Sequence, residues 1–490
     1  MFETAFAQVR FSLSMALGLP FQRRSLERLL EAMHATRAEF GGFGTDAGEL
    51  ISGPVLDRAA QRELQARRFG ELLRRARGET VYYGRLLHDL DLDPGDLRHE
   101  DIARLPLTCR EALAAEPDAF VRRGSSPALR ASTTGTTGRP ASVYFSEREL
   151  TSTAALTALN FLHTGRVEPE DVVVVALRTR STAAAAGLAE ACARVGSPVD
   201  VAGVIDPARM LNLLSERRSI AGKRPRVSVM ATYPSYLGEL VDTGTRAGWG
   251  PSDFGLRRIL LGGEIATAGL RSRVERVFGP VEIEEAYGMT EIAPFVGTRC
   301  AAGHLHFQAS GGLLELVDLE SAGAPAPGAP GTIVATPFPP FRDATVLLRY
   351  HTEDVAIALN GPLDCDMAGV PATSEIQGRL GQVVRHEEGW TFPRQLVEAL
   401  EASEAVPLPA RYGGWAVPGG VAVEVVTNSR ASTVRRNVER ALEQREVPVR
   451  ELRLCEHPRE LRRPRPLRCD HKEAAMAPLR APARQRMEAA

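Results

Sequence analysis

The chain has 490 residues, of which 44% are hydrophobic and 25% charged, as is typical of soluble globular enzymes. This length predicts two to four domains. The 60 basic and 61 acidic residues leave a net charge of -1, so bulk charge does not support a nucleic-acid partner. Glu3 stands where a secretory signal would carry bases, and the apolar stretch at residues 11–20 is too short to span a bilayer. We therefore predict a cytoplasmic protein without a membrane segment.

Two residue types are unusually distributed. The six cysteines are spread along the chain without a dense framework, which favours free thiols or metal ligands over disulfides. Among the 60 basic residues only Lys223 and Lys472 are lysines. An arginine bias of this kind is typical of genomic base composition, so a lysine that remains is a candidate for a role that needs an amine. Lys223 lies in a basic stretch that we expect to be solvated.

The first third of the chain predicts helices. Residues 1–60 have a poor helical pattern, interrupted by glycines at 41–44. Apolar residues from 64 onward follow helical spacing, and we expect that helix to end at residues 81–84. A short helix should then lead to the next feature.

That feature is a Thr/Gly loop at residues 132–140, with the sequence STTGTTGRP. Short extended segments are expected on both sides of it. Turn amides, hydroxyls and one guanidinium, Arg139, together suit a polyphosphate. No Gly-Lys-[Ser/Thr] sequence opens a helix here, so it is not a Walker A loop. From this loop alone, a phosphate-binding loop and a flexible surface turn without a binding role are equally supported.

Residues 150–290 alternate strands and helices. Strands are predicted at 171–177, 199–204, 226–231, 256–261 and 281–286, with helices at 183–195, from 207 and at 268–278. Such alternation predicts a parallel sheet covered on both faces, whose ligands bind beyond the carboxyl ends of the strands.

The predicted secondary structure changes twice in the last third of the chain. Predicted strands at 313–317, 332–336 and 346–350 without helices indicate a smaller β-rich subdomain. Beyond a linker at 378–379, strands at 382–384, 421–426 and 449–454 alternate with helices at 393–402 and 432–443. The fold class is therefore α/β, with a β-rich subdomain and a small α+β C-terminal domain.

Five motifs occur in order along the chain: the Thr/Gly loop, LGGE at 261–264, AYGMTE at 286–291, RYHTED at 349–354 and GR at 378–379. This series resembles the acyl-adenylate-forming enzymes, and within them the phenylacetate–CoA ligase branch. The sequences LPLT at 105–108, YPSYL at 233–237 and FPRQLVE at 392–398 support that resemblance. The resemblance runs from about residue 64 to the end and implies an AMP-binding adenylation domain at 64–377 and a mobile C-terminal lid domain at 378–490. Residues 1–63 are then an N-terminal helical extension. The resemblance also allows a homodimer.

The resemblance implies a role for each motif. The loop residues that would wrap the β- and γ-phosphates are Thr133, Thr134, Gly135, Thr136, Thr137, Gly138 and Arg139, the last in place of a usual lysine. The residues that would line the adenine and acyl pockets are Gly263, Glu264, Ile265, Glu285, Ala286 and Tyr287. Thr290 would touch the α-phosphate, and Glu291 would hold Mg²⁺. Asp354 would accept both ribose hydroxyls. Arg379 would contact the nucleotide.

Lys472 is the candidate for the lysine that bridges the carboxylate and the α-phosphate during adenylation. Its alternative is an ordinary tail lysine, and the scarcity of lysine favours the catalytic role. The family's RTGD appears here as HTED at 351–354, the acidic hinge residues are replaced by LGQ at 380–382, and a Gly-Lys signature before Lys472 is absent. These departures concern the domain rotation and the thioester half-reaction more than nucleotide binding.

A zinc site is a further implication. Cys300, His306 and Cys365 resemble the zinc ligands of some of these ligases, where the last element is Cys-x-Cys. Met367 replaces the second cysteine here, so a neighbouring carboxylate, Asp364 or Asp366, would complete a structural tetrahedron. The alternative is two thiols and a histidine that never meet.

The leading hypothesis is an ATP-dependent ligase that adenylates an aryl or other small carboxylic acid and transfers the acyl group to coenzyme A. A carrier-protein thiol or an amine is the alternative acceptor. A nucleotide-binding protein without ligase activity is the third hypothesis. The candidate walls of the substrate pocket are Gly288 and five aromatic residues: Tyr144, Phe161, Tyr233, Tyr236 and Tyr287. Aromatic side chains at such places are as often part of a core.

Overall fold

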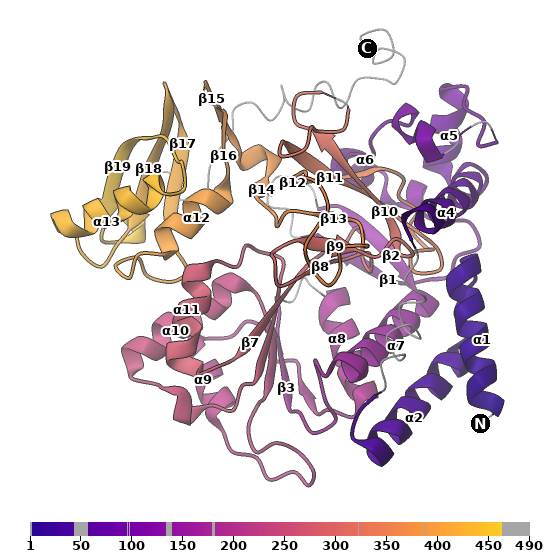
Figure 1. Cartoon of the computed structure of the whole chain (residues 1–490), viewed down its shortest axis with the longest axis horizontal. Coiled ribbons are helices and arrows are strands. Elements are labelled where there is room, and N and C mark those ends of the chain that lie inside the picture. Colours follow the sequence, from indigo (N-terminus) through magenta and orange to yellow (C-terminus); the bar gives the residue numbers. More distant parts are fainter. Residues whose placement is uncertain are drawn as a thin grey trace.

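An eight-stranded mixed sheet forms the centre of the larger part of the molecule (Figure 1). The computed structural model describes residues 2–43, 57–95, 97, 99–133, 140–178, 182–321, 323–387 and 389–462. The strand order is β13-β9-β8-β7-β6-β5-β3-β4, parallel from β7 to β4 and antiparallel from β7 to β13. The strands are β3 (Val173–Ala176), β4 (Val199–Asp200), β5 (Val229–Thr232), β6 (Arg258–Gly262), β7 (Glu282–Tyr287), β8 (Gly297–Arg299), β9 (Leu305–Phe307) and β13 (Ala372–Thr373).

Helices connect the parallel strands, and all of them except α10 were predicted from the sequence. They are α8 (Thr182–Val195), α9 (Pro207–Ser215), α10 (Pro234–Ala247) and α11 (Ala268–Phe278). Local signals determine their ends: α10 has proline at its first position, and Gly248 ends it with a left-handed φ of 76°. Strand β3 is buried along its whole length, which explains its continuous run of valines. The strand predicted at 199–204 is only two residues long in β4.

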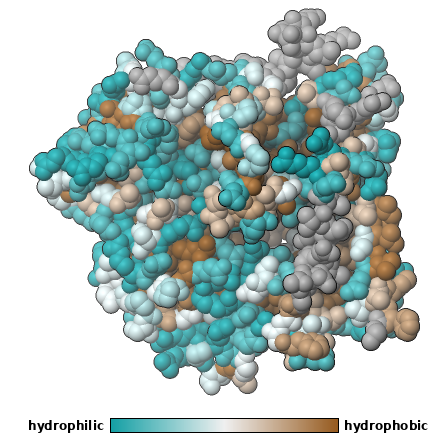
Figure 2. Space-filling model, in the orientation of Figure 1, coloured by the Kyte–Doolittle hydropathy of each residue, from teal (hydrophilic) through white to brown (hydrophobic). Residues whose placement is uncertain are grey.

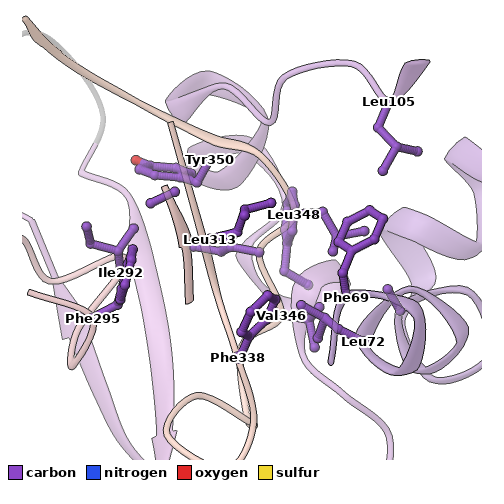
Figure 3. Packing of buried hydrophobic residues seen from close by; sticks show 14 of the residues in the cluster. Phe69, Leu72, Leu105, Ile292, Phe295, Leu313, Phe338, Val346, Leu348 and Tyr350 are labelled. Carbon is purple, nitrogen blue, oxygen red and sulfur yellow. The ribbon is translucent and has the colours of Figure 1, made fainter. Parts of the chain in front are cut away.

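A second, four-stranded antiparallel sheet has the order β10-β11-β12-β14. Its strands are β10 (Gly312–Asp318), β11 (Pro330–Pro337), β12 (Tyr350–Ile357) and β14 (Gly378–Arg379). The strand predicted at 346–350 is wrong, because β12 begins only at Tyr350. Arg349 has a φ of 47°, which interrupts the extended backbone. Val346 and Leu348 are instead buried in a core cluster against Phe69 (Figure 3).

Two shorter elements frame the Thr/Gly loop. Strands β1 (Pro127–Ser132) and β2 (Ser142–Ser146) are antiparallel, with Ser132 opposite Ser142. The prediction of extended segments on both sides of the loop is therefore confirmed. Helix α7 (Glu147–Thr164) follows β2 directly and begins with a capping box, in which the Ser146 hydroxyl accepts from the Glu149 amide.

The N-terminal third is helical. Its main helices are α1 (Phe2–Leu17), α2 (Arg23–Phe40), α4 (Arg58–Glu79), α5 (Val81–Asp89) and α6 (Arg110–Ala115). The break expected at 81–84 is wrong by a few residues, because Val81 begins α5. The break lies at Thr80, whose hydroxyl caps α5 by accepting from the Tyr83 amide. Among the described residues, no helix is long and apolar enough to cross a membrane.

The C-terminal part forms a separate lobe in Figure 1. Its elements are β15 (Val384–His386), β16 (Gly389–Thr391), α12 (Pro393–Glu401), β17 (Tyr412–Val417), β18 (Gly420–Val426), α13 (Ser432–Glu443) and β19 (Val449–Cys455). Helix α12 docks on α11 of the larger part, where the Ala268 amide donates to Glu398 Oε2 at 3.1 Å. A Cβ on Gly269 would lie 2.2 Å from the Glu401 carbonyl oxygen, so glycine is required for this contact.

Candidate active site

Asp354 lies on a β-bulge where the two sheets approach each other. The register of β11 and β12 passes from Thr332 opposite Val355 to Val334 opposite His351, so β12 holds extra residues at this point. Glu353, in the bulge, has a left-handed φ of 63°. Bulges change the direction of the neighbouring side chain. Because of this one, Asp354 departs from the regular register of the strand.

Each oxygen of Asp354 contacts a side chain from another element. Oδ1 pairs with Nε of Arg379 on β14 at 2.9 Å, and Oδ2 accepts from the Tyr287 hydroxyl at the end of β7 at 2.9 Å. Burial raises the pKa of Asp354 even though Arg379 opposes the shift. Each oxygen keeps a second lone pair, so the carboxylate can still accept from a ligand's hydroxyls.

Glu291 lies just beyond β7 and is 2% exposed. Its Oε1 accepts from the Tyr350 hydroxyl at 3.1 Å, and Tyr350 lies at the edge of the core cluster in Figure 3. Burial raises the pKa of Glu291 above its ordinary value of 4.5. Among the ion pairs of the described residues, none involves Glu291. A buried carboxylate of this kind suits a hard cation, which prefers oxygen ligands.

Three arginines interact electrostatically with Glu291. Arg110 and Arg379 both lower its pKa electrostatically, and Glu291 in turn acts on Arg342. Arg110 Nη2 donates to the hydroxyl of Thr133 at 2.7 Å, which places the first threonine of the Thr/Gly loop beside Arg110. The site is therefore rich in guanidinium groups that can bind anionic oxygens.

Arg342 is the least satisfied of the three arginines. It is 2% exposed, and none of its three guanidinium nitrogens has a hydrogen-bond partner among the residues that the structure describes. Its Cζ lies 4.0 Å from the ring centroid of Phe145 on β2. Burial lowers the pKa of Arg342. A buried guanidinium without a partner is costly, so this group is a strong candidate to meet an anionic ligand.

The carboxyl ends of β5 and β6 bring a second group together. Gly263 follows β6 with a φ of 78°, and a Cβ there would lie 3.2 Å from the Tyr233 ring. Glu264 accepts from the Ser235 amide at 2.9 Å and pairs with Arg178 at 3.2 Å. The Arg178 guanidinium lies 4.7 Å from the Tyr233 ring centroid. Gly263, Glu264 and Tyr233 thus share the sheet edge at which ligands bind in such folds.

Other predicted pocket residues make contacts of their own. Glu285 on β7 pairs with Arg271 at 2.9 Å and lies 3.8 Å from Arg299. The Tyr236 hydroxyl donates to the Ile205 carbonyl at 2.7 Å, and the Tyr144 hydroxyl donates to Asp118 at 2.6 Å. These polar atoms therefore already have protein partners.

The remaining predicted residues are placed by β6 and β7. Ala286 lies opposite Gly262 on β6, and Ile265 follows Glu264 in the loop after β6. Gly288 and Thr290 lie between β7 and Glu291. A Cβ on Gly288 would lie 3.0 Å from Val296 Cγ1. The predicted residues outside the described ones are Thr134, Gly135, Thr136, Thr137, Gly138, Arg139 and Lys472.

Cys300, His306 and Cys365 come together, as predicted. The fourth member of the cluster is His304, and the ligand atoms of all four residues lie within 4.8 Å of one another. The predicted carboxylate, Asp364 or Asp366, is wrong, because neither belongs to this cluster. His306 Nδ1 lies 3.2 Å from the Val370 carbonyl, which orients its Nε2 toward Cys365 Sγ at 3.5 Å. His304 Nδ1 is buried and has no hydrogen-bond partner among the described residues. Two thiols and two imidazoles are a donor set that fits zinc.

Sequence reasoning missed Arg110, Arg342 and His304. A signal existed for His304, because it stands two residues before His306, and such residues share one face of an extended strand. No local signal marks Arg342, since its surroundings come from β2 and the loop after β11. Arg110 is one of many arginines, and only its contact with Thr133 distinguishes it.

Comparisons with known proteins agree with this geometry. Residues 86–337 match the family described as AMP-binding enzyme. A search of curated protein sequences finds no match. Among solved structures, a 2-hydroxyisobutyryl-CoA ligase in its postadenylation state is 18% identical, with 89% of this chain and 94% of that chain covered and a TM-score of 0.69. The same ligase in its thioesterification state gives 0.57, at 19% identity and equal coverage.

A more distant structural neighbour is the anthranilate CoA ligase AuaEII. It is 15% identical, with 67% of this chain and 63% of that chain covered and a TM-score of 0.50. These likenesses support the fold, and the family match extends over more than half of the chain. The arginine-surrounded carboxylates thus lie in a protein that belongs to the AMP-binding enzyme family, within the acyl-adenylate-forming superfamily.

Proposed function

We propose that the protein is an AMP-forming ligase that activates a carboxylic acid with ATP. The observation that carries this proposal is the pair of buried carboxylates, Asp354 and Glu291, with three arginines around Glu291. A nucleotide polyphosphate is an anion that such a site can hold, while its ribose offers hydroxyls to a carboxylate.

In the first half-reaction, a carboxylate oxygen of the substrate attacks the α-phosphorus of ATP. The bond from this phosphorus to the bridging oxygen of the β-phosphate breaks, and pyrophosphate leaves with the electron pair. Arg342 and Arg379, with Arg139 of the loop, would neutralise the phosphates. Thr133 and Thr290 would add hydroxyl donors. Lys472 would offset the charges of the two reacting anions.

Asp354 would orient the ribose, and its own position is determined by Arg379 and Tyr287. Glu291 fits a Mg²⁺ site, since its buried carboxylate offers oxygen ligands. It accepts a hydrogen bond from the Tyr350 hydroxyl and has no ion-pair partner among the described residues. A bound Mg²⁺ supplies charge neutralisation for the polyphosphate. The proposed nucleotide and acyl pocket extends over the sheet edge, with these lining residues: Gly263, Glu264, Ile265, Glu285, Ala286, Tyr287, Gly288 and Tyr233.

In the second half-reaction, the sulfur of coenzyme A attacks the acyl carbon, loses its proton and displaces AMP. The structures of the 2-hydroxyisobutyryl-CoA ligase include complexes with an acyl-AMP and coenzyme A. We propose an aryl acid as the substrate, on the resemblance of the motifs to phenylacetate–CoA ligases. A carrier-protein thiol or an amine is the second candidate acceptor, favoured by the LGQ sequence at the hinge.

We also propose that Cys300, His304, His306 and Cys365 hold a structural zinc ion. Four protein donors would close the coordination sphere, which is typical of structural rather than catalytic zinc. Metal analysis of the purified protein tests this. Wild type should contain one equivalent of zinc, Cys365→Ser should lose it, and Cys109→Ser should retain it. Zinc retained in Cys365→Ser would contradict the proposal.

The experiment that tests the function is pyrophosphate–ATP exchange over a panel of aryl, alkyl and amino acids. Exchange that depends on one acid class supports adenylation, and Lys472→Ala should abolish it. ATP binding without exchange for any acid would favour the nucleotide-binding alternative. Mass spectrometry of products formed with coenzyme A, holo carrier protein and amines supplied separately then identifies the acceptor.

A further inference from the structure

The outer face of α1 is an exposed apolar stripe. Five large side chains lie on it, with exposed fractions from 45% for Leu17 to 93% for Phe2: Phe2, Phe6, Val9, Leu13 and Leu17. Their spacing of four, three, four and four residues places them on one side of a helix. Figure 2 shows this apolar surface at the right edge of the molecule. Leu19, 46% exposed, extends it beyond the helix.

The inner face of α1 is apolar as well. Ala7 and Phe11 are buried in a core cluster that also contains residues of α2 and α7, and Phe11 stacks on Phe21 with ring centroids 5.5 Å apart. Among the residues that the structure describes, none covers the outer apolar face of α1.

The two charged residues of α1 already have partners within the chain. Glu3 pairs with Arg28 on α2 at 3.1 Å, and Arg10 donates to Gln22 at 2.7 Å. The helix therefore has one acidic and one basic side chain and no net charge, although Arg10 keeps its own positive charge, with its Cζ 4.4 Å from the ring centroid of Phe6. Helices that bind membrane surfaces carry several lysines or arginines on their polar face, and α1 has one arginine. An uncharged protein surface is the better complement.

We propose that α1 of a second copy of this chain covers the stripe, in an antiparallel pair across a two-fold axis near Val9. In an antiparallel pair, the numbers of facing residues have a constant sum. A sum of 19 places the two-fold axis between residues 9 and 10, so that Phe2 faces Leu17 and Phe6 faces Leu13. Each phenylalanine thus lies opposite a leucine, and the smaller Val9 lies beside its own copy at the axis. A two-fold contact requires such a self-complementary surface.

The area is sufficient for a dimer. If a large apolar side chain presents roughly 100–200 Å² when fully exposed, the five side chains of the stripe on α1 present on the order of 500 Å² per copy. Two copies together bury about 1,000 Å², which reaches the ~1,000 Å² expected of a biological interface. Contiguous apolar patches of this size mark interaction sites on soluble proteins.

Sedimentation velocity of the full-length protein tests the pair. Wild type should sediment as a dimer, and Val9→Arg as a monomer because two like charges meet at the axis. Val201→Arg is the matched control, since Val201 is 53% exposed elsewhere on the surface, and it should remain a dimer. Circular dichroism should show all three proteins folded. A monomeric wild type, or a dimeric Val9→Arg, would overturn the proposal.

A charge pair tests the antiparallel register. Phe6→Glu and Leu13→Lys should each give monomers, and the double variant should restore the dimer because position 6 faces position 13 of the copy. Failure of the double variant to dimerise would overturn this register. Monomeric wild type that co-sediments with phosphatidylcholine vesicles would assign the stripe to a membrane instead. Pyrophosphate exchange should be equal in wild type and Val9→Arg, so the outcome is independent of the proposed activity.

Discussion

Asp354 and Glu291 are two buried carboxylates in one site, but their surroundings differ. Asp354 has a guanidinium at 2.9 Å and a tyrosine hydroxyl at 2.9 Å. Glu291 accepts from a tyrosine hydroxyl at 3.1 Å and has no ion-pair partner among the described residues. Burial raises the pKa of both side chains. Asp354 is thus charge-compensated within the protein, whereas Glu291 depends on a cation that the described residues do not supply at contact distance.

This difference separates two tasks. A compensated carboxylate can accept hydroxyls without a net charge change, which suits the recognition of ribose. An uncompensated one gains most from a divalent cation, which suits the binding of Mg²⁺ with a polyphosphate. Substitutions at Asp354 and at Glu291 should therefore affect different properties of the protein.

Glu291→Gln should have the largest effect. The amide keeps an acceptor for Tyr350 but loses the charge that binds a cation, so pyrophosphate exchange should fall about 100-fold or more. Folding should be retained, because no buried charge is created. Glu282→Gln is a control on β7, where the glutamate side chain is 61% exposed. Exchange at the wild-type rate in Glu291→Gln would refute its role in binding Mg²⁺.

Arg379→Met should destabilise the protein by about 1–3 kcal/mol. Removing one member of a buried pair leaves the other charge uncompensated, and the expected cost is reduced here because the Arg379 side chain is 41% exposed. Asp354→Asn should cost less, since it removes the buried charge itself. Urea denaturation of both single variants and the double variant measures the coupling. Additive effects would show that the pair does not stabilise the fold.

Gly269→Ala should disturb the contact between Asp354 and Arg379 and leave the surroundings of Glu291 unchanged. The new Cβ would meet the Glu401 backbone and displace α12. The Arg394 amide on α12 donates to the Gln377 carbonyl at 2.9 Å, next to β14 and Arg379. We expect a loss of about 1–2 kcal/mol and weaker ATP binding by calorimetry, with unchanged dependence on Mg²⁺.

Gly187→Ala is the matched control for Gly269→Ala. Gly187 lies within α8 with no atom within 4 Å of an added Cβ, so alanine there should stabilise the helix slightly. Equal stability effects in the two variants would contradict the proposed clash with Glu401.

The smallest effect concerns pH. Because the pKa of Glu291 is raised in the folded state, the native carboxyl keeps a proton that the unfolded one has lost above about pH 4.5. Its contribution to the free energy of unfolding therefore falls as pH rises through the folded pKa, and is constant above it. Glu291→Gln lacks this contribution. Its stability relative to wild type, measured by denaturation without Mg²⁺, should rise across that pH range, whereas a constant difference would contradict the raised pKa.

The parallel sheet and its helices could be predicted because local patterns determine them. The predicted bounds of α11 and α13 agree with the structure, since helical periodicity and clear ends coincide there. The strand predicted at 346–350 failed for a tertiary reason. Its apolar residues cover α4 rather than extend a sheet, and the left-handed backbone of Arg349 separates them from β12.

The site residues that lie in sequence motifs could be predicted. Those that depend on contacts between distant segments could not. Asp354, Tyr287 and Arg379 lie in three motifs, and the structure brings them into contact. Arg342 became visible only with the packing of Phe145 and the missing hydrogen-bond partners. The Cys/His cluster lies between these cases, because three of its members had been predicted and His304 replaced a carboxylate.

One detail of the fold has a practical consequence for chemical labelling. The Lys223 ammonium donates to the carbonyls of Pro169 and Gly196, both at 2.8 Å, so it is not the solvated side chain expected from the sequence. The chain has only one other lysine, Lys472. An amine-selective reagent therefore meets two side-chain amines, one of which is held by two hydrogen bonds. The labelling of Lys472 by such a reagent, followed by mass spectrometry with and without ATP, reports on a single proposed catalytic group in the unaltered protein.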